Sequence, residues 1–426
     1  MNDRHVPTAG VQYLKQHRGT NMTALHKIIL LAALVTSGPA MAQYSDGVVK
    51  IGVLTDMSGP YSELAGPGSV AAARLAVQDF DAAAKGIKVE IISGDMQNKT
   101  DVGVNLATSW FDVEKVDVIV DLPNSAIALA VSDIARQKNK LFLAVSTATS
   151  NLTGAKCNAN TIHWLYDTWA NANGTGKATV KSGGDTWFFV TVDYAFGHAA
   201  ERDAAAAIEA NGGKVVGKVR HPLNTPDFSS FLLQAQASRA KVIGLANGGA
   251  DTINAVKQAA EFGIVKGGQN LAALFMVVTD VAALGLPTAQ GLVFTDAWYW
   301  DANDQNRAWT KRWQVESERP GRFPSSVHAG VYSAVTHYLK AVEALKSDAD
   351  GRAVADKMKE MRTEDRLLGI GTIRADGRKI HDMYLREVKK PEESEYPGDF
   401  LKTRATIPAA EAFRPLNEGG CPLVSG

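Results

Sequence analysis

The stretch "KIGVLTDMSGPYSELAGPGSVAAARLAV", residues 50–77, joins an apolar segment of strand length to a glycine-containing loop and then to a run of good helix formers. Its strand is a continuous apolar run without alternating polar residues, which is typical of a parallel strand covered by helices on both faces. A loop between the carboxyl end of such a strand and a helix is where open α/β sheets bind ligands. The stretch therefore predicts an α/β fold and a candidate binding loop.

The same strand–helix pattern continues along the chain and then occurs a second time. The first series has expected strands at 48–56, 88–96, 116–123 and 140–147 and expected helices at 68–84, 100–115 and 125–138. The second has expected strands at 186–193, 214–220, 241–246 and 271–278 and expected helices at 197–210, 227–239 and 251–262. Two such series predict two doubly wound lobes.

Beyond residue 290 the pattern does not begin a third series. The remaining segments are an expected strand at 291–300, helices at 303–319 and 325–346, and a hairpin of 371–374 with 379–388. We expect them to complete the two lobes, which requires more than one crossover and places a hinge beside a cleft. The expected division is 43–166 plus about 294–368 for lobe 1, and 167–293 plus about 369–426 for lobe 2.

The N-terminal residues have the organisation of an export signal. A short basic region at His26 and Lys27 precedes an apolar run at 28–35 and an A-x-A sequence at 40–42. This order is typical of a secretory signal peptide, expected at 22–42, and the apolar run is shorter than the roughly 20 residues that span a bilayer. Residues 1–21 are then an upstream extension if translation starts at Met22. The mature protein is expected in the periplasm.

Charge and cysteine content limit the classes of partner. The 45 basic and 45 acidic residues cancel, so nucleic acid is not an expected partner, because it needs a basic excess. The two cysteines, Cys157 and Cys421, favour a disulfide over a metal site in an exported chain, with two free thiols as the alternative. Such a disulfide would attach the C-terminal tail to the body of the protein.

Known catalytic and nucleotide-binding motifs do not fit the sequence. A dinucleotide loop beginning at Gly66 would need glycine where Ala71 stands, and a G-x-x-x-x-G-K string at 212–218 is followed by Val219 instead of serine or threonine. No G-x-S-x-G elbow or cysteine–histidine cluster is present. We therefore expect no enzymatic activity, no cofactor and no metal.

Small hydrogen-bonding residues follow the strands in both expected lobes. They occur at 56–59, 124–125, 146–150, 193–197 and 247–249. Hydroxyl groups, amides and helix N-termini bind a carboxylate without covalent chemistry, and Tyr61, Phe196 and Trp298 are candidate apolar walls. The pattern favours a non-covalent binding site between the lobes.

With these features the chain resembles the periplasmic substrate-binding proteins of ABC importers, specifically the branched-chain amino acid (Leu/Ile/Val) type with a type I periplasmic binding fold. The resemblance covers about residues 48–390 and also rests on "VDVIVDLPNSAIALAVSDIA", "LFLAVSTATSNLTG" and "WFFVTVDYAFGHAAERD". It implies a ligand gripped between the lobes and a closed form recognised by membrane permease subunits. The ligand-binding positions that it implies are Leu64, Asn124, Ser125, Thr147, Thr149, Phe196, Asn247, Gly248 and Asp280, with Tyr166 and Asp167 at the first crossover.

Departures from the family pattern argue against leucine as the ligand. Asn124 stands where leucine binders usually have serine, and Leu64 where they have an aromatic residue. The glutamate that receives an amino group has only Asp280 as a counterpart. The expected function is a monomeric receptor that delivers a small polar or carboxylate-bearing molecule, such as an amino acid, an amide or an aromatic acid, to an importer. An exported sensor partner and an α/β enzyme are the alternatives.

Overall fold

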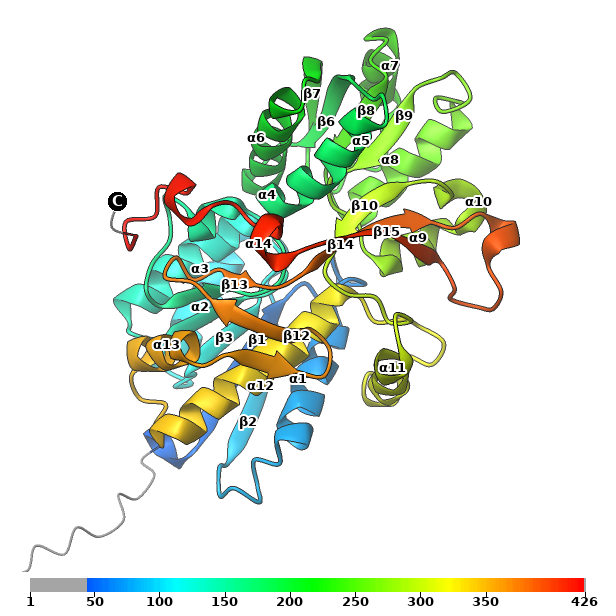
Figure 1. Ribbon diagram of the computed structural model, residues 1–426. Coiled ribbons are helices and arrows are strands. Elements are labelled where there is room, and N and C mark those ends of the chain that lie inside the picture. The colour runs from blue at the N-terminus through cyan, green and yellow to red at the C-terminus, as the bar shows by residue number, and fades with distance from the viewer. Residues whose placement is uncertain (1–43, 425–426) are drawn as a thin grey trace, which may run out of the picture. The chain divides into compact units, whose positions relative to one another are not determined.

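Two parallel sheets form the framework of residues 44–424, the part of the chain that the computed structural model describes (Figure 1). The expected extension at 1–21 and signal peptide at 22–42 lie outside the described residues. The first sheet has the strand order β2-β1-β3-β4-β5, and each neighbouring pair is parallel. Its strands are β1 (Val49–Thr55), β2 (Val89–Asp95), β3 (Val118–Asp121), β4 (Leu141–Ala144) and β5 (Thr161–His163).

The second sheet repeats the strand order of the first. Its order is β7-β6-β8-β9, again with parallel neighbours, so the first strand of each series lies between the second and the third. The strands are β6 (Thr186–Val192), β7 (Lys214–His221), β8 (Val242–Ala246) and β9 (Asn270–Ala273). The predicted doubled α/β series is therefore confirmed. The change of winding direction beside β1 and β6 is the position where such sheets form ligand crevices.

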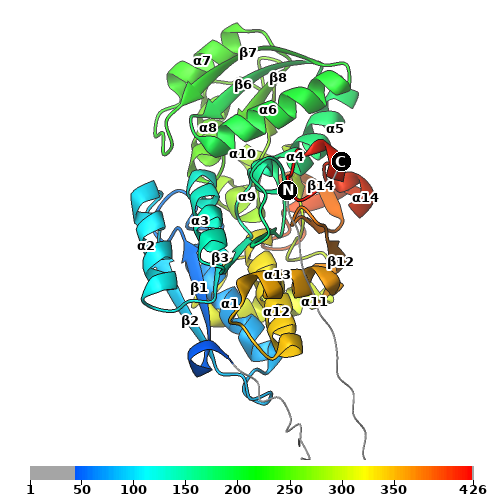
Figure 2. The same cartoon turned by 90° about the vertical axis from the view of Figure 1, so that its left-hand side faces the viewer.

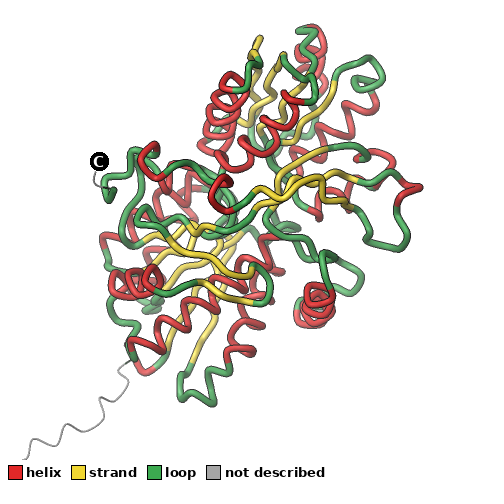
Figure 3. The backbone as a smooth tube through the Cα atoms, viewed as in Figure 1, coloured by secondary structure: helices red, strands yellow, loops and turns green. Residues whose placement is uncertain are grey.

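Helices cover both faces of the sheets (Figures 2 and 3). Successive residues of a strand point to opposite faces, so Val120 of β3 joins the apolar core with α1 and α12, whereas Ile119 joins the core with α2 and α3. The helices are α1 (Gly66–Phe80), α2 (Thr100–Asp112), α3 (Ser125–Gln137), α4 (Thr168–Asn171), α5 (Lys177–Lys181), α6 (Ala195–Ala210), α7 (Ser229–Ala237), α8 (Ala250–Glu261), α9 (Val278–Leu284), α10 (Leu286–Ala289), α11 (Asp304–Glu316), α12 (Ser326–Leu345), α13 (Gly351–Glu360) and α14 (Ala409–Ala412).

The start of α1 packs closely against α11 and α12. A Cβ atom at Gly68 would lie 2.4 Å from Nε2 of His328, so only glycine fits at this position. Trp313 Nε1 donates a hydrogen bond to Gly68 O at 3.0 Å, and Pro67 occupies the first turn, where a missing N–H costs nothing. The glycine of the opening loop thus serves helix packing, and this packing holds the end of the loop in place.

Two small antiparallel sheets complete the fold. One has the order β10-β14-β15 and the other β11-β12-β13. Their strands are β10 (Val293–Asp296), β11 (Thr363–Asp365), β12 (Gly369–Ile373), β13 (Lys379–Ile380), β14 (Met383–Val388) and β15 (Leu401–Ile407). The predicted hairpin forms between β12 and β13, but the chain then leaves it, and β14 pairs with β10 and β15 instead. The predicted strand at 291–300 is shorter, and β15 was not predicted.

The chain passes between the two parallel sheets several times, as predicted. It leaves the first sheet after β5, returns after β10 through α11 and α12, and crosses again after β13. Backbone contacts tie β13 to the first crossover, since His163 N donates to Gly377 O at 2.9 Å. The predicted disulfide between Cys157 and Cys421 is present, with 5.5 Å between the Cα atoms, and holds the C-terminal segment beside the loop before β5. From residue 44 to residue 424, no helix is both long and apolar enough to cross a membrane.

Candidate ligand-binding cleft

The loop after β1 is shaped by the carboxylate of Asp56. This carboxylate accepts hydrogen bonds from Gly59 N at 2.8 Å, from Tyr61 N at 2.9 Å and from Asn98 Nδ2 at 2.7 Å. A buried carboxylate needs such partners, and the backbone N–H groups of the loop supply two of them because the loop turns around Asp56. The loop consequently presents Tyr61 and Leu64 on its inner side, where both side chains line a cleft.

The polar residues predicted after β3 and β4 lie together, but most of their atoms already have protein partners. Asn124 caps α3 by accepting from Ala126 N and Ile127 N, and Thr147 Oγ1 donates to Leu122 O at 2.5 Å. Ser125 Oγ accepts from Thr149 N at 3.3 Å. Ser146 Oγ is different, because among the described residues it has no hydrogen-bond partner and it lines the cleft.

The residues predicted on the second lobe divide into two groups. Phe196, at the start of α6, lines the cleft, and Gly248 is placed so that its Cβ would lie 2.8 Å from the ring of Phe275. Asn247 is held within its own lobe, where its Nδ2 lies 3.1 Å from Nε2 of His221 and its Oδ1 accepts from Thr252. The second lobe thus contributes mainly apolar surface to the cleft.

Loops of the two lobes touch across the cleft. Tyr61 Oη lies 2.7 Å from Tyr194 Oη, and Ala250 N donates to Pro60 O at 3.1 Å. The residues that line the cleft are Tyr61, Leu64, Pro123, Ser146, Ala148, Tyr194, Phe196 and Phe275. The space left between these side chains is only about 10 Å³, which is too small to hold a solute in this conformation.

Behind the cleft lies Tyr166 of the first crossover, surrounded by acidic residues. Its hydroxyl donates to Ser146 O at 3.1 Å, and its ring lies 5.0 Å from that of Phe275. Burial raises the pKa of Tyr166 well above its usual value, and the charges of the nearby Asp296, Asp121 and Asp280 raise it further. Tyr166 therefore stays protonated and connects the cleft wall to the crossover.

The three carboxyl groups near Tyr166 are buried and hold protons unusually well. Burial raises the pKa of Asp121 to about 6 and the pKa values of Asp280 and Asp296 to about 7. Neither oxygen of Asp121 has a hydrogen-bond partner among the described residues, whereas Asp280 accepts from Val277 N at 3.1 Å. Asp280 does not line the cleft in this conformation, so it acts on the cleft only through its charge.

Asp167, the other crossover residue, is structural. It caps α4 by accepting from Ala170 N at 2.8 Å, and it lies 3.5 Å from the buried guanidinium of Arg378. Burial raises its pKa, and the charge of Arg378 opposes that rise. Asp167 thereby links the first crossover to Arg378, which immediately precedes β13.

Several cleft residues were not among the predicted binding positions. Tyr61, Pro123 and Phe275 lie outside the polar segments predicted after the strands, whereas Ser146, Ala148 and Tyr194 lie inside the predicted segments 146–150 and 193–197 but were not singled out. Tyr61 was predicted only as an apolar wall, and Tyr194 belongs to the same D-Y-A-F-G segment as Phe196, so its position had a signal. Phe275 lies in an apolar run that reads as core and had none. Trp298, the other aromatic residue suggested for the walls, lines a separate cavity beside the crossovers.

Two α/β lobes that close over an aromatic cleft, with several crossovers between them, define a two-lobed solute-binding protein. The family model described as periplasmic binding protein matches residues 48–394, and the chain belongs to this family. The predicted family and fold are confirmed. Members of this family bind solutes without transforming them. Between residues 44 and 424 we find no group of histidine, cysteine and acidic side chains arranged to hold a metal.

Known relatives agree with this assignment. A periplasmic binding protein from Burkholderia mallei is 48% identical, covers 89% of this chain and 100% of its own, and superposes with a TM-score of 0.86. A branched chain amino acid ABC transporter periplasmic ligand-binding protein from Burkholderia xenovorans is 39% identical, with coverage of 88% and 99% and a TM-score of 0.77. The Leu/Ile/Val-binding protein homolog 6 of Brucella melitensis is 27% identical over 390 residues, which are 89% of this chain and 97% of that protein.

Proposed function

We propose that this chain captures a small solute in the cleft and delivers it to the membrane subunits of an ABC importer in the periplasm. The observation that carries the proposal is the closure of the cleft, in which Tyr61 of one lobe and Tyr194 of the other meet at 2.7 Å. Opening and closing about the crossovers would let a solute enter and then seal it from water. Residues 22–42 would direct export, and the protein would act as a monomer.

The cleft favours a compact solute with an apolar body and a polar end. Four of its eight lining residues are aromatic, and none of the eight carries a charge. Leu64, Phe196 and the backbone at Gly248 would contact the apolar body. The polar end would face Ser146 and the hydroxyl- and amide-bearing residues around it, namely Asn124, Ser125, Thr147 and Thr149.

An amino group on the solute would lie near buried carboxyl groups on the inner side of the cleft. Asp121 and Asp280 lie near Tyr166, whose hydroxyl donates to the backbone of the cleft residue Ser146. A cation close to these carboxyl groups would favour their ionised form, because an opposite charge lowers the pKa of an acid. Amino acids, amides and aromatic acids are therefore the solute classes to test first.

The experiment is a thermal-shift and calorimetric screen with amino acids, amides, short-chain acids and benzoates, followed by two serine variants. For a solute with a carboxylate, Ser146→Ala removes a hydrogen bond of about 1.5–3 kcal/mol and weakens binding at least about tenfold. Ser132→Ala is the matched control, because Ser132 is equally buried but pairs with Thr161 at 2.8 Å, away from the cleft lining.

The two variants separate a binding effect from a folding effect. We expect Ser132→Ala to lower the melting temperature and to leave the dissociation constant within about twofold. Equal dissociation constants for the parent and Ser146→Ala would contradict the placement of the polar end. Native mass spectrometry of the purified protein gives an independent identification of a solute that remains bound.

A further inference from the structure

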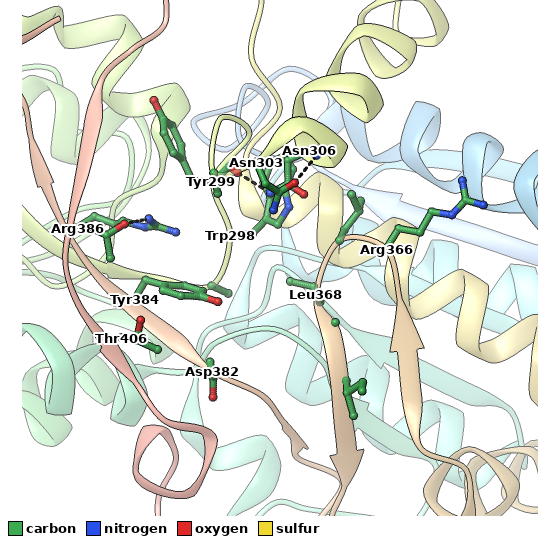
Figure 4. Close-up of a pocket in the computed structure, with 16 residues that line it drawn as sticks. Trp298, Tyr299, Asn303, Asn306, Arg366, Leu368, Asp382, Tyr384, Arg386 and Thr406 are labelled. Carbon is green, nitrogen blue, oxygen red and sulfur yellow. Dashed lines mark hydrogen bonds between the residues drawn. The ribbon is translucent and has the colours of Figure 1, made fainter.

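A second cavity lies beside the crossovers and shares no lining residue with the cleft. Its volume is about 580 Å³, within the range of about 300–1,000 Å³ that is usual for small-molecule sites. The segment after β10, the strands β14 and β15, and the loop between β11 and β12 form its walls (Figure 4). We call it the crossover cavity. It is lined by Ala297, Trp298, Tyr299, Ala302, Asn303, Asn306, Arg366, Leu367, Leu368, Gly369, Ile370, Asp382, Tyr384, Arg386, Thr403 and Thr406.

Arg386 is the unusual residue of the crossover cavity. It lies on β14, the central strand of its sheet, and only 4% of it is exposed. Figure 4 shows its guanidinium directed into the cavity between Tyr299 and Tyr384, whose ring centres lie 5.7 Å and 4.6 Å away. Aromatic faces attract a cation, but they do not accept its hydrogen bonds as a carboxylate does.

The guanidinium lacks a counterion of its own. Its Nη1 donates to Thr403 Oγ1, while Nε has no partner and no acceptor reaches Nη2 among the described residues. By contrast, Arg404 on the neighbouring strand β15 has a counterion, because it forms an ion pair with Glu387 of β14. A buried charge without an ion pair is costly, so Arg386 is expected to be stabilised by an anion that enters the cavity.

Other charged groups near the cavity do not replace this anion. The carboxylate of Asp382 is exposed at the rim and accepts from Ala409 N at 2.8 Å. Asp296 accepts from Ala297 N and forms no salt bridge with Arg386 among the described residues, although its charge and that of Arg386 favour each other at longer range. Arg366 also lines the cavity, but Figure 4 shows its guanidinium directed away from Arg386.

The remaining walls combine polar and apolar side chains, with Asn303, Asn306, Thr403 and Thr406 beside Leu367, Leu368 and Ile370. Leu367, Leu368 and Trp298 line the cavity, and Ile370 is 57% exposed. A ligand with an apolar body would cover this surface, which is favourable at about 25 cal/mol per Å² of apolar area. The walls thus combine one buried cation with amide and hydroxyl groups and with apolar and aromatic surface.

We propose that the crossover cavity binds a small organic carboxylate, whose anionic group pairs with Arg386 and whose apolar body lies against Leu368, Ile370 and Trp298. This site is additional to the cleft and does not depend on the identity of the transported solute. Its walls include two of the segments that join the lobes, so its occupant contacts the part of the molecule about which the lobes move.

Benzoate is the probe, and benzamide is its neutral counterpart of the same shape. Crystals of the parent protein soaked with 4-bromobenzoate are expected to show a bromine anomalous peak in the crossover cavity, with the carboxylate beside Arg386. In solution, 4-fluorobenzoate followed by fluorine NMR is expected to bind at least tenfold more tightly than 4-fluorobenzamide.

Two arginine variants test the anion contact. Arg386→Met is expected to weaken 4-fluorobenzoate binding at the cavity at least tenfold, whereas Arg404→Met, on the neighbouring strand, changes it less than twofold. A bromine peak only in the cleft or nowhere, equal binding of the amide, or unchanged binding in Arg386→Met would overturn the proposal. If Arg386→Met does not fold, the position of bromine in the parent protein decides.

Discussion

Gly249 is the residue at which a single methyl group should prevent closure of the cleft. It precedes α8 with a φ of +57°, and a Cβ atom there would lie 2.3 Å from Pro60 O of the other lobe. The same carbonyl oxygen accepts the hydrogen bond from Ala250 N at 3.1 Å. In Gly249→Ala the two loops must therefore move apart in the closed form, whereas the open form has no such contact.

The expected loss of affinity follows from two contributions. A Cβ and an oxygen atom rarely approach within 3.0 Å, so the loops must separate by several tenths of an ångström or more. Overpacking of this kind costs about 1–3 kcal/mol and the weakened hydrogen bond about 1 kcal/mol. A total of about 2–4 kcal/mol corresponds to roughly 30- to 900-fold weaker solute binding.

Gly263→Ala provides the matched control. Gly263 follows α8 with a φ of +67°, but nothing lies within 4 Å of a Cβ at that position. Alanine at a positive φ lowers the free energy of unfolding in both variants, and by more at Gly249, whose ψ of −132° lies outside the left-handed helical region. Only Gly249→Ala should also lose affinity.

The assay is calorimetry with the tightest-binding compound of the solute screen, combined with small-angle scattering to follow closure. Saturating solute should make the parent and Gly263→Ala more compact and should leave Gly249→Ala in a more open form. If Gly249→Ala binds and closes as the parent does, the contact between Pro60 and the start of α8 does not govern closure.

Three further predictions concern the contact between Tyr61 and Tyr194, the buried acidic residues and the disulfide. Tyr194→Phe leaves the hydroxyl of Tyr61 without a partner in the closed cleft and should weaken solute binding by about 1–2 kcal/mol, while the double variant with Tyr61→Phe should recover part of the loss, since no hydroxyl is then stranded; calorimetry that finds two simply additive losses would contradict this. The pKa of Asp280 is about 7 when folded and near 4 when unfolded, so the folded state holds an extra proton between these pH values and stability falls as pH rises from about 4 to 7. Asp280→Asn should therefore reduce the pH dependence of the free energy of unfolding in that window by up to about 1.4 kcal/mol per pH unit, which melting temperatures measured across the window will follow. An unchanged slope would argue against the assignment. Replacing Cys157 and Cys421 by serine opens a loop of 264 residues and should cost about 3 kcal/mol in guanidinium unfolding without changing solute affinity; an unchanged unfolding midpoint would be the contrary result.

The sequence by itself determined the architecture of the two lobes. Apolar runs such as 118–120 favour cover on both faces, which is typical of parallel strands between helices, and their alternation with helical segments favoured that arrangement. Repetition of the pattern fixed the number of lobes, and polar residues after the strands indicated which edge of each sheet binds a ligand. With two cysteines the chain can form a single internal disulfide, and Cys157 and Cys421 do form it.

Tertiary structure decided which side chains at those edges face a solute. Thr147 and Asn247 carry the expected polar groups, but neighbouring backbone and side-chain atoms occupy them. Tyr194 and Phe275 come from segments far apart in the chain and meet only because two sheets approach each other. Contacts between segments that are far apart in the chain produce no periodic pattern in the sequence.

The same reason explains the parts of the fold that were not predicted. The strand β15 is polar and exposed along most of its length, and it forms because β14 offers it an edge of unpaired backbone groups. Arg386 resembles any surface arginine of an alternating strand until the crossovers bury it beside Tyr299 and Tyr384. Local propensity and periodicity determine which elements exist, whereas burial, which depends on the packing of distant segments, determines which of their charges are left without a partner.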